Sequence, residues 1–458
     1  MAQGPILPQP SGLSSRELQE TTLQVRSSLT DLVESFIWAS QKAREWVQTG
    51  RQTDFLPSYW AGLTDRPMFY SRDLAHQMLG GHLLGLDAEN LAMLRHFAGS
   101  ATERRGWYPL WAFMFDGTPA AIDYRSDDDF VREIPAPFEL VEKAVEQYRW
   151  TRDERFLRTP EIASFIRTTL TSFVQAHDPL GTGVAGERGS GQIFQGTATY
   201  NEVEHPPHLL VAADGIASQW AAHAALAGVA ADAALDPEFA RWNAERAAAM
   251  ETEFADGWWL AQHDRYTAGF THEGPVIGFG LESTWFPAVK GLMRADDRAT
   301  AHLDFLSACL DKSPPHNIEA FTYLPEAYLR YGRDEEALRW IRFLADSRAD
   351  YPEVPFTHVA HIATGLTGLS VGPRNGEVGT RSHIPADAWL DVEGIAAGTS
   401  TIGVRHEGHQ ASELWVTGGS SVSWTSTWPD GRTIRVGVPL GGRVRVTADG
   451  ATTAAPAP

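Results

Sequence analysis

The stretch SRDLAHQMLGGHLLGLDAENLAMLRHFAGS, residues 71–100, decides the fold class because it reads as two helices with almost no loop between them. Asp87 is the expected N-cap of the second helix. Leu91, Leu94 and Phe97 then follow at helical spacing. A turn this short makes the two helices antiparallel neighbours. The stretch therefore predicts a helical hairpin.

The hairpin pattern repeats along the chain from Ser14 to Gly372, where we expect about twelve helices, the first over residues 15–49. Short, plain turns alternate with connections that are longer or richer in polar and aromatic residues. Six hairpins closed into a ring form an (α/α)6 barrel with every second helix inside. We predict a mainly α chain in which residues 14–375 form this barrel. An irregular all-α domain is the alternative.

The pattern changes to period two after about Arg381. Runs such as AWLDVEG, TIGVRHEG and ASELWVTG are short, rich in β-branched residues and bounded by Gly, Pro or Asp. They predict a small antiparallel β-sandwich over residues 381–450. Residues 1–13 and the tail 451–458 are expected to be disordered.

Composition narrows the function classes. The 458 residues carry a formal net charge of −20, which disfavours nucleic acid as a partner. No apolar run is long enough to span a membrane. The single cysteine, Cys309, excludes an intrachain disulfide. The opening MAQGPILPQPSGLSS lacks a basic start followed by an apolar run, so we expect a cytoplasmic protein. A secreted protein that has lost its leader is the alternative.

Glutamates gather where the chain leads into the predicted inner helices. Glu202 and Glu204 precede the sixth helix, and Glu282, Glu319 and Glu353 lie at or near the starts of the eighth, tenth and twelfth. The starts of inner helices meet at one end of a barrel, so these acids are expected around one rim. A carboxylic acid beside apolar groups can protonate a leaving oxygen, and an ionised carboxylate can activate water. These glutamates are the catalytic candidates, with helix capping as the alternative for each.

Other residues in these connections are candidates for holding a substrate. Arg72 and Asp73 can grip vicinal hydroxyls, since a guanidinium donates hydrogen bonds and a carboxylate accepts them. The remaining candidates offer rings that stack on a sugar or polar groups that bind its hydroxyls: Trp107, Trp111, Asp123, Asp127, Tyr200, His205, Trp285, His316 and His358. The acidic run 127–129 does not match EF-hand spacing, so we expect no metal.

Three stretches and the predicted architecture resemble the six-hairpin glycosidase superfamily, which includes glucoamylases, trehalases and bacterial α-L-rhamnosidases. FYSRDLAH (69–76) resembles the Arg-Asp stretch that opens an inner helix of glucoamylases and contacts the terminal sugar. TYNEVEH (199–205) lies where glucoamylases carry the general acid within a Glu-Glu pair, and YPEVPFTH (351–358) lies where these inverting families place the general base. The predicted C-terminal domain is similar to the β-domain that follows the barrel in rhamnosidases.

The resemblance implies a glycoside hydrolase that is inverting and exo-acting on a small glycoside or an oligosaccharide end. Glu202 or Glu204 would protonate the glycosidic oxygen. Glu353 would activate a water, with Glu319 and Glu282 as rivals. Carboxylates alone can perform this chemistry, so no cofactor is expected.

Three alternatives remain at this point. A sugar epimerase would move protons with His316, His358 and His361. A polysaccharide lyase would use Tyr200 and His205. A carbohydrate-binding protein would use the aromatic rings and dispense with the glutamates.

Overall fold

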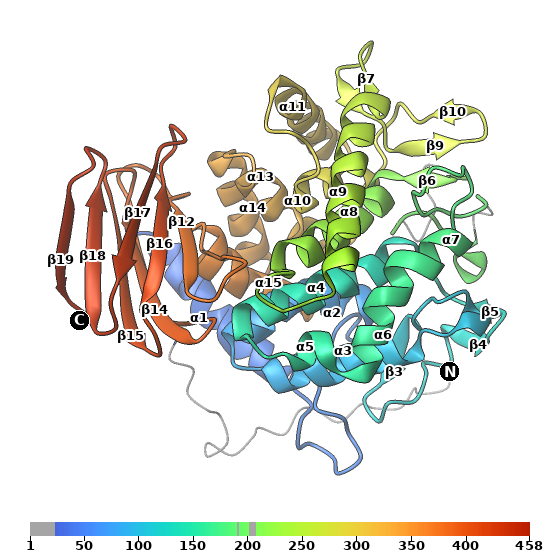
Figure 1. The fold of residues 1–458 in the computed structure, drawn as a ribbon, viewed down its shortest axis with the longest axis horizontal. Coiled ribbons are helices and arrows are strands. Elements are labelled where there is room, and N and C mark those ends of the chain that lie inside the picture. Colours follow the sequence, from blue (N-terminus) through green and yellow to red (C-terminus); the bar gives the residue numbers. More distant parts are fainter. Residues whose placement is uncertain (1–22, 190–191, 201–207) are drawn as a thin grey trace, which may run out of the picture.

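The computed structural model describes residues 23–189, 192–200 and 208–458. Helices make up the larger part, and the C-terminal strands stand beside them at the left of Figure 1. None of the helices in this part of the chain combines the length and the apolar character that a membrane crossing requires. Residues 1–13, expected to be disordered, lie outside the described part.

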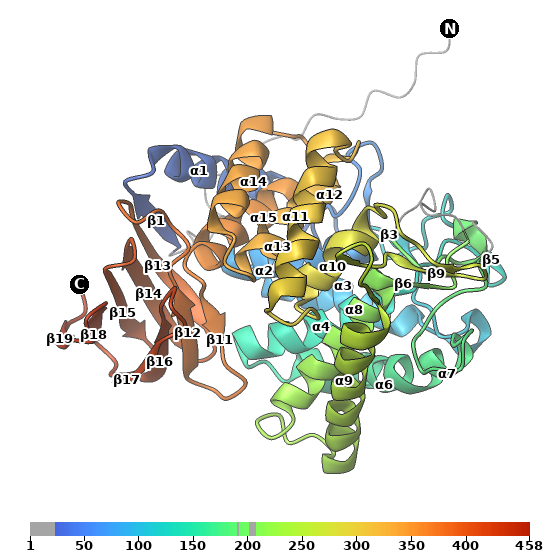
Figure 2. The same cartoon turned by 90° about the horizontal axis from the view of Figure 1, so that it is seen from above.

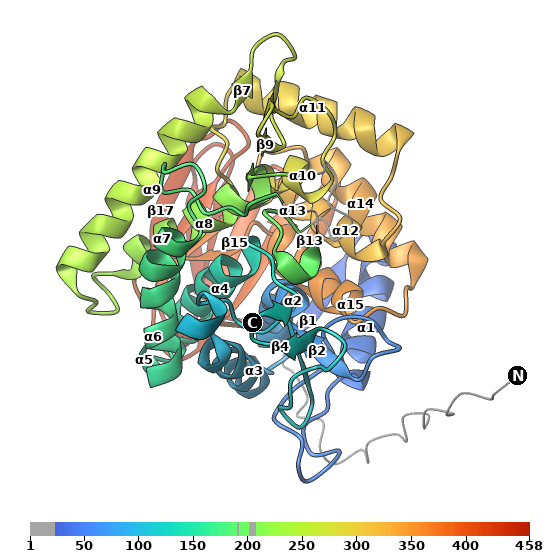
Figure 3. The same cartoon turned by 90° about the vertical axis from the view of Figure 1, so that its right-hand side faces the viewer.

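Six helical segments form a closed inner ring, in which each segment contacts the next and the last contacts the first. Figure 3 shows this ring with the other helices around it. The segments are α2 (Ser71–Leu83), α4 (Pro135–Thr151), α8 (Ala213–Val229), α10 (Glu282–Lys290), α12 (Ile318–Thr322) with α13 (Leu324–Leu329), and α15 (Glu353–Ala360). Every residue of α15 is buried, as expected of a helix surrounded by others.

An outer helix precedes each inner segment, so the six hairpins are present in the predicted order. The outer helices are α1 (Thr30–Glu45), α3 (Asp87–Ser100), α5 (Arg155–Arg158) with α6 (Pro160–Thr168), the π-helical turn η2 (Thr169–Phe173) and α7 (Val174–Ala176), α9 (Pro237–Gly257), α11 (Asp297–Lys312) and α14 (Asp334–Ser347). In α14 the buried residues Leu338, Ile341, Leu344 and Ala345 recur at helical spacing, which marks the face turned to the ring. The predicted mainly α barrel is confirmed at this level.

One glycine in the opening stretch sets how closely two inner helices approach. A Cβ added to Gly80 of α2 would lie 2.1 Å from the backbone oxygen of Phe356 in α15. Only glycine allows this contact, so it lets α2 and α15 pack closely. The predicted cap of α3 is wrong: Asp87 makes no capping hydrogen bond, and its Oδ1 lies 2.8 Å from His82 Nδ1 instead.

Short strands in the connections hold the starts of the inner helices. β2 (Met68–Tyr70) leads directly into α2 and pairs with β3 (Ala112–Met114). β6 (Val211–Ala212) leads into α8 and pairs with β9 (Gly269–Thr271). The remaining short strands are β4 (Tyr124–Ser126), β5 (Asp129–Phe130), β7 (Trp259–Leu260), β8 (Arg265–Tyr266) and β10 (Gly274–Pro275).

The C-terminal strands form two sheets that are consistent with a β-sandwich. Their orders are β1-β13-β14-β15-β18-β19 and β11-β12-β16-β17. The strands are β1 (Gln24–Ser27), β11 (Ser370–Val371), β12 (Glu377–Arg381), β13 (Trp389–Ala397), β14 (Ser400–Glu407), β15 (Ala411–Gly418), β16 (Val422–Thr427), β17 (Thr433–Val438), β18 (Gly442–Thr447) and β19 (Thr452–Pro456). The pairing of β12 with β16 is parallel, which the antiparallel prediction missed.

Three predicted boundaries differ from the structure. The first helix was expected from residue 15, but β1 precedes α1 and pairs with β13, with Val25 opposite Val392 (Figure 2). The tail expected to be disordered contains β19, which pairs with β18. The β-domain begins with β11 and β12, before residue 381. β1 pairs with a strand more than 360 residues away, which a local sequence pattern does not reveal, whereas β19 and β11 pair with their neighbours in the chain, β18 and β12.

Candidate active site

The N-terminal ends of three inner helices bring predicted site residues into one buried network. Arg72 and Asp73 begin α2, Glu319 lies in the first turn of α12, and Glu353 begins α15. Arg72 is ion-paired with Glu319. We call these four residues together with Tyr351 the carboxylate centre. All five are buried, so their charges and hydrogen bonds act in a poorly hydrated environment.

Tyr351 links two of the acids. Its hydroxyl lies 2.8 Å from Asp73 Oδ1 and 2.8 Å from Glu319 Oε2. Burial, reinforced by the charges of Glu319 and Glu353, raises the pKa of Asp73 well above its usual range. Because a phenol has one proton, it donates to one carboxylate, and a protonated Asp73 donates to it in turn.

Glu353 is completely inaccessible to solvent, and one of its carboxylate oxygens makes no hydrogen bond to the described residues. Its Oε1 is bonded to His76 Nδ1 and accepts a hydrogen bond of 3.1 Å from Thr322 Oγ1. Its Oε2 is buried and has no hydrogen-bond partner among the described residues. Burial raises the pKa of Glu353 to about 7, although the contact with His76 opposes the shift. The contacts with His76 and Thr322 therefore orient this carboxyl group while Oε2 stays able to accept.

His76 is a buried ring between two carboxylates, and the sequence analysis did not select it. Its Nε2 lies 3.0 Å from Glu326 Oε1, and its ring stacks on Tyr323 with centroids 3.8 Å apart. Burial lowers the pKa of His76, but Glu326 and Glu353 outweigh it and raise the value to about 9. The available signal was the helical spacing, because His76 follows Asp73 by three residues and shares its side of α2.

Glu282 begins α10 beside the carboxylate centre. Burial raises its pKa to about 8, while the charge of Arg72 opposes the shift and that of Glu319 adds to it. A carboxyl group with this pKa is protonated at neutral pH. The protonated form suits a general acid, whereas the sequence suggested Glu282 as a rival for the general base.

Trp111 and a further acid lie beside the start of α2. The backbone oxygen of Trp111 accepts a 2.9 Å hydrogen bond from Ser71 N, and its Nε1 donates to Glu133 Oε2 at 2.9 Å. Glu133 is buried and stands two residues before α4. Glu133 was not predicted from the sequence, although it precedes an inner helix as the other acids do.

Tyr200 is a buried candidate that is brought to the centre. Its backbone oxygen accepts a 3.0 Å hydrogen bond from Arg72 Nη1, and the guanidinium lies over its ring. Its hydroxyl donates to Glu139 Oε2 at 2.5 Å. Glu202, Glu204 and His205 follow it directly in the chain but lie outside the described residues.

Several substrate-binding predictions do not fit their surroundings. Trp285 is completely buried in the core, one turn into α10, and has no ring face open to a sugar. His358 is buried against α1, where its Nε2 lies 2.9 Å from Ser35 Oγ. Burial lowers the pKa of His358 to about 3, so it is a neutral core residue. His316 is exposed and lines a groove on the outer surface with residues of α11 and α14.

The acidic and aromatic residues of the 100–137 connection have local roles. Asp127 is held by Arg105 at 2.7 Å and by Arg104 at 2.9 Å, so its charge is already compensated. Asp123 is buried, and its charge contributes to the raised pKa of Tyr70, in which burial is the larger cause. Trp107 is half-buried with a left-handed backbone, φ 67°. Within this group, a hydrogen bond to Ser71 N ties Trp111 to the start of α2.

Neither a family model nor a curated protein matches the chain. Solved structures share its fold. A GH78 family rhamnosidase of Bacillus sp. GL1 is similar with a TM-score of 0.60 and 14% identity, over 90% of this chain and 43% of that one. A putative kojibiose phosphorylase from the human microbiome is similar with a TM-score of 0.61 and 8% identity, over 93% of this chain and 63% of that one.

An α-L-rhamnosidase from Dictyoglumus thermophilum is similar with a TM-score of 0.60 and 12% identity, over 93% of this chain and 50% of that one. The chain thus spans between 43% and 63% of the length of these three proteins. At such identities the likeness concerns architecture. The chain has the six-hairpin (α/α)6-barrel fold, followed by a β-domain, as the sequence resemblance indicated.

Proposed function

We propose that the carboxylate centre hydrolyses the glycosidic bond of a small glycoside or an oligosaccharide end, with inversion at the anomeric carbon. One observation carries the proposal: the starts of α2, α12 and α15 bring an Arg-Asp pair and two glutamates together, and Glu282 at the start of α10 lies near enough to feel the charges of Arg72 and Glu319. Arg72 and Asp73 would bind sugar hydroxyls, since they combine donors with an acceptor. The fold shared with rhamnosidases supports the same class of substrate.

Glu353 is the proposed general base. His76 and Thr322 orient its carboxyl group, and its second oxygen has no partner in the described part of the chain. Such an oxygen suits a water molecule placed against the anomeric carbon. Glu319, the rival for this role, is engaged by Arg72 and Tyr351 and therefore suits a positioning role better.

The general acid is sought among Glu282, Glu202 and Glu204. Of these three, Glu282 lies in the described part of the chain, and burial keeps it protonated at neutral pH. As the glycosidic bond breaks, the acid gives its proton to the leaving oxygen. The base takes a proton from the attacking water, so one water is consumed for each bond cleaved. In an inverting mechanism, the carboxyl groups of the acid and the base lie about 6.5–9.5 Å apart, which leaves room for the water between them.

The epimerase and the lyase alternatives lack catalytic groups with a suitable position or a suitable pKa. An epimerase based on His316, His358 and His361 would find the first on the outer surface, the second against α1 and the third buried beside Glu326. A lyase based on Tyr200 and His205 needs a phenol that loses its proton, and His205 lies outside the described residues. Burial and the nearby Glu139 hold the pKa of this phenol well above its usual range.

A panel of nitrophenyl glycosides and disaccharides tests for turnover, and proton NMR of the first product anomer tests for inversion. We expect Glu353→Gln to lower kcat about 10²–10⁴-fold while sugar binding is kept. Glu335→Gln, an exposed change at the start of α14, is the matched control and should be silent. A protein that binds these sugars without cleaving any of them would overturn the proposal.

Substrates with different leaving groups identify the general acid. A dinitrophenolate departs without protonation, whereas a sugar alcohol needs a proton. Among Glu202→Gln, Glu204→Gln and Glu282→Gln, the variant that loses natural disaccharide cleavage but keeps dinitrophenyl glycoside cleavage has lost the acid. Equal losses on both substrates would assign the changed residue to another role.

A further inference from the structure

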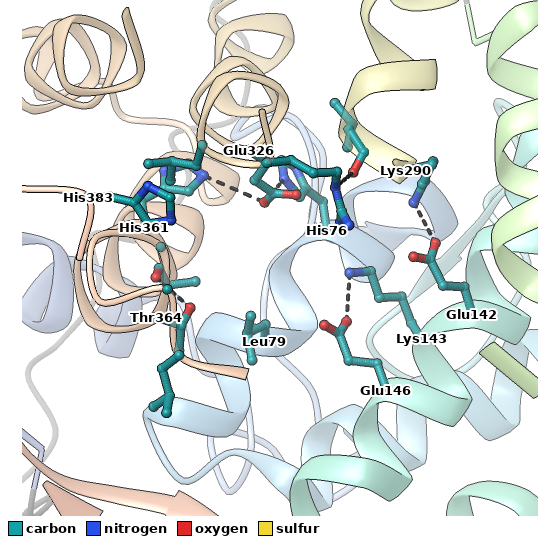
Figure 4. Close-up of a pocket in the computed structure, with 17 residues that line it drawn as sticks. His76, Leu79, Glu142, Lys143, Glu146, Lys290, Glu326, His361, Thr364 and His383 are labelled. Atoms are coloured by element: carbon teal, nitrogen blue, oxygen red, sulfur yellow. Dashed lines mark hydrogen bonds and ion pairs between the residues drawn. The ribbon is translucent and has the colours of Figure 1, made fainter. Parts of the chain in front are cut away.

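A polar cavity lies toward the C-terminal ends of the inner helices, at the end of the barrel away from their N-terminal ends. Its volume is about 320 Å³, and it is lined by residues of α2, α4, α10, α13, α15 and the π-helical turn η4 (His361–Gly365). His76, Glu326 and His361 are part of its wall. Figure 4 shows these three together, with the Lys143–Glu146 and Lys290–Glu142 pairs to the right of them.

The spacing of these three side chains fits a single ion. Glu326 Oε1 lies 3.0 Å from His76 Nε2 and 3.6 Å from His361 Nε2, and one ligand atom from each residue lies within 4.8 Å of the other two. Zinc bonds of about 2.0–2.2 Å in a tetrahedron place ligand atoms about 3.3 Å apart. Small side-chain rotations would therefore bring all three atoms to bonding distance of one centre.

His361 gives an independent sign that a ligand is expected. It is 2% exposed, and neither ring nitrogen makes a hydrogen bond of normal length among the described residues, although the Glu326 carboxylate and the Thr322 backbone lie close to the ring. Burying a polar ring with contacts this weak is costly. The ring lines the cavity, and its Nε2 faces Glu326 at a distance too long for a hydrogen bond.

We propose that His76, Glu326 and His361 bind one divalent transition-metal ion of zinc type, with water from the cavity at the open position. Two imidazoles and one carboxylate favour such an ion over magnesium or calcium, which prefer oxygen ligands. The nearby cations do not oppose it strongly, because Lys143 is paired with Glu146 and Lys290 with Glu142. This site goes beyond the proposed glycosidase activity and does not depend on it.

His76 would connect the ion to the carboxylate centre. The ion replaces the proton on Nε2, and Nδ1 keeps its proton and donates it in the hydrogen bond to Glu353. A carboxylate behind a metal-bound histidine is the usual way in which proteins fix the orientation of such a ligand. The ion would thus hold the ring that positions Glu353.

Cobalt(II) serves as the spectroscopic probe. The full chain, stripped with a chelator, is titrated with Co²⁺, and we expect visible d–d absorption that saturates at one ion per chain and disappears when Zn²⁺ is added. Zn²⁺ should also raise the thermal unfolding temperature. His361→Ala and Glu326→Gln should each weaken Co²⁺ binding at least 100-fold, whereas His358→Gln, a change at a buried histidine one turn earlier, should bind as the wild type does.

Two results would overturn the site. One is the absence of saturable Co²⁺ binding to the wild type. The other is binding that survives in both Glu326→Gln and His361→Ala but is lost in Glu319→Gln, which would place the ion at the carboxylate centre. Circular dichroism of the metal-free variants checks their folding, and Glu326→Gln keeps the side-chain shape if His361→Ala fails to fold. Since the readout is ion binding, a failure here leaves the hydrolase test untouched.

Discussion

His76 is bonded to Glu353 through Nδ1 and reaches Glu326 with Nε2 at 3.0 Å, so one ring contacts acids that face opposite ends of the barrel. The ring is buried and stacks on Tyr323, which restricts its orientation. A change in what His76 Nε2 binds therefore changes the position of the ring, and with it the hydrogen bond between Nδ1 and Glu353. The two contacts can be separated by substitution, because an amide can replace either nitrogen.

Replacement of His76 by Asn or Gln separates the two contacts. The Asn amide nitrogen lies as many bonds from Cα as Nδ1 does, and the Gln amide nitrogen as many as Nε2. We expect His76→Asn to keep most of kcat on a cleaved glycoside. His76→Gln should lose about 10²-fold in kcat with little change in KM, the effect of a misplaced catalytic group. Equal losses in both variants would mean that His76 has only a structural role.

The raised pKa of Glu282 predicts an alkaline limit to activity. The acid must be protonated to act, and it loses its proton as the pH rises through about 8. We expect kcat/KM to fall above that pH in the wild type and this limb to be absent in Glu282→Gln, whose overall rate is lower. Glu273→Gln, a change at an exposed acid just before α10, is the control. An unchanged alkaline limb in Glu282→Gln would exclude Glu282 as the acid.

Tyr351→Phe tests the link between Asp73 and Glu319. Removing the hydroxyl leaves two buried carboxyl groups without their shared partner, and we expect a loss of about 1–3 kcal/mol in unfolding free energy, measured in urea. Turnover should fall as well. Tyr331→Phe removes a hydroxyl bonded to one backbone oxygen at 2.8 Å, that of Met293, and should spare turnover. A Tyr351→Phe enzyme with full activity would contradict this role.

The sequence located the acids of the carboxylate centre because helix starts are local features. The starts of α12 and α15 carry Glu319 and Glu353, and closing the ring places them together. Which residues along an inner helix face the barrel axis could not be predicted in this way. Inner helices are buried on nearly every side, so no apolar stripe shows which residues face the axis. Trp285 and His358 were therefore misplaced, His76 and Glu326 were overlooked, and His361 was considered only as an epimerase base.

The neutral state of His358 predicts a loss of stability in acid. Its pKa is about 3 in the folded protein and near 6.5 when unfolded, so the unfolded chain binds more protons between these values. The stability that His358 contributes is complete above pH 6.5 and is lost as the pH falls toward 3. We expect His358→Gln, which can still reach Ser35, to flatten the pH dependence of urea unfolding over this range. His272→Asn, at an exposed histidine, should leave that dependence unchanged.

β1 ties the start of the chain to the β-domain across more than 360 residues, since Arg26 pairs with Asp391 in the strand register. A chain that begins at Leu29 lacks this strand, so the edge of β13 is unpaired and the core that buried Val25 is exposed. We expect it to lose about 2 kcal/mol or more in unfolding free energy and to aggregate, measured by thermal unfolding and light scattering. A chain that begins at Leu23 keeps β1 and is the control. If both truncated chains unfold at the same temperature, β1 adds nothing to the stability of the domain.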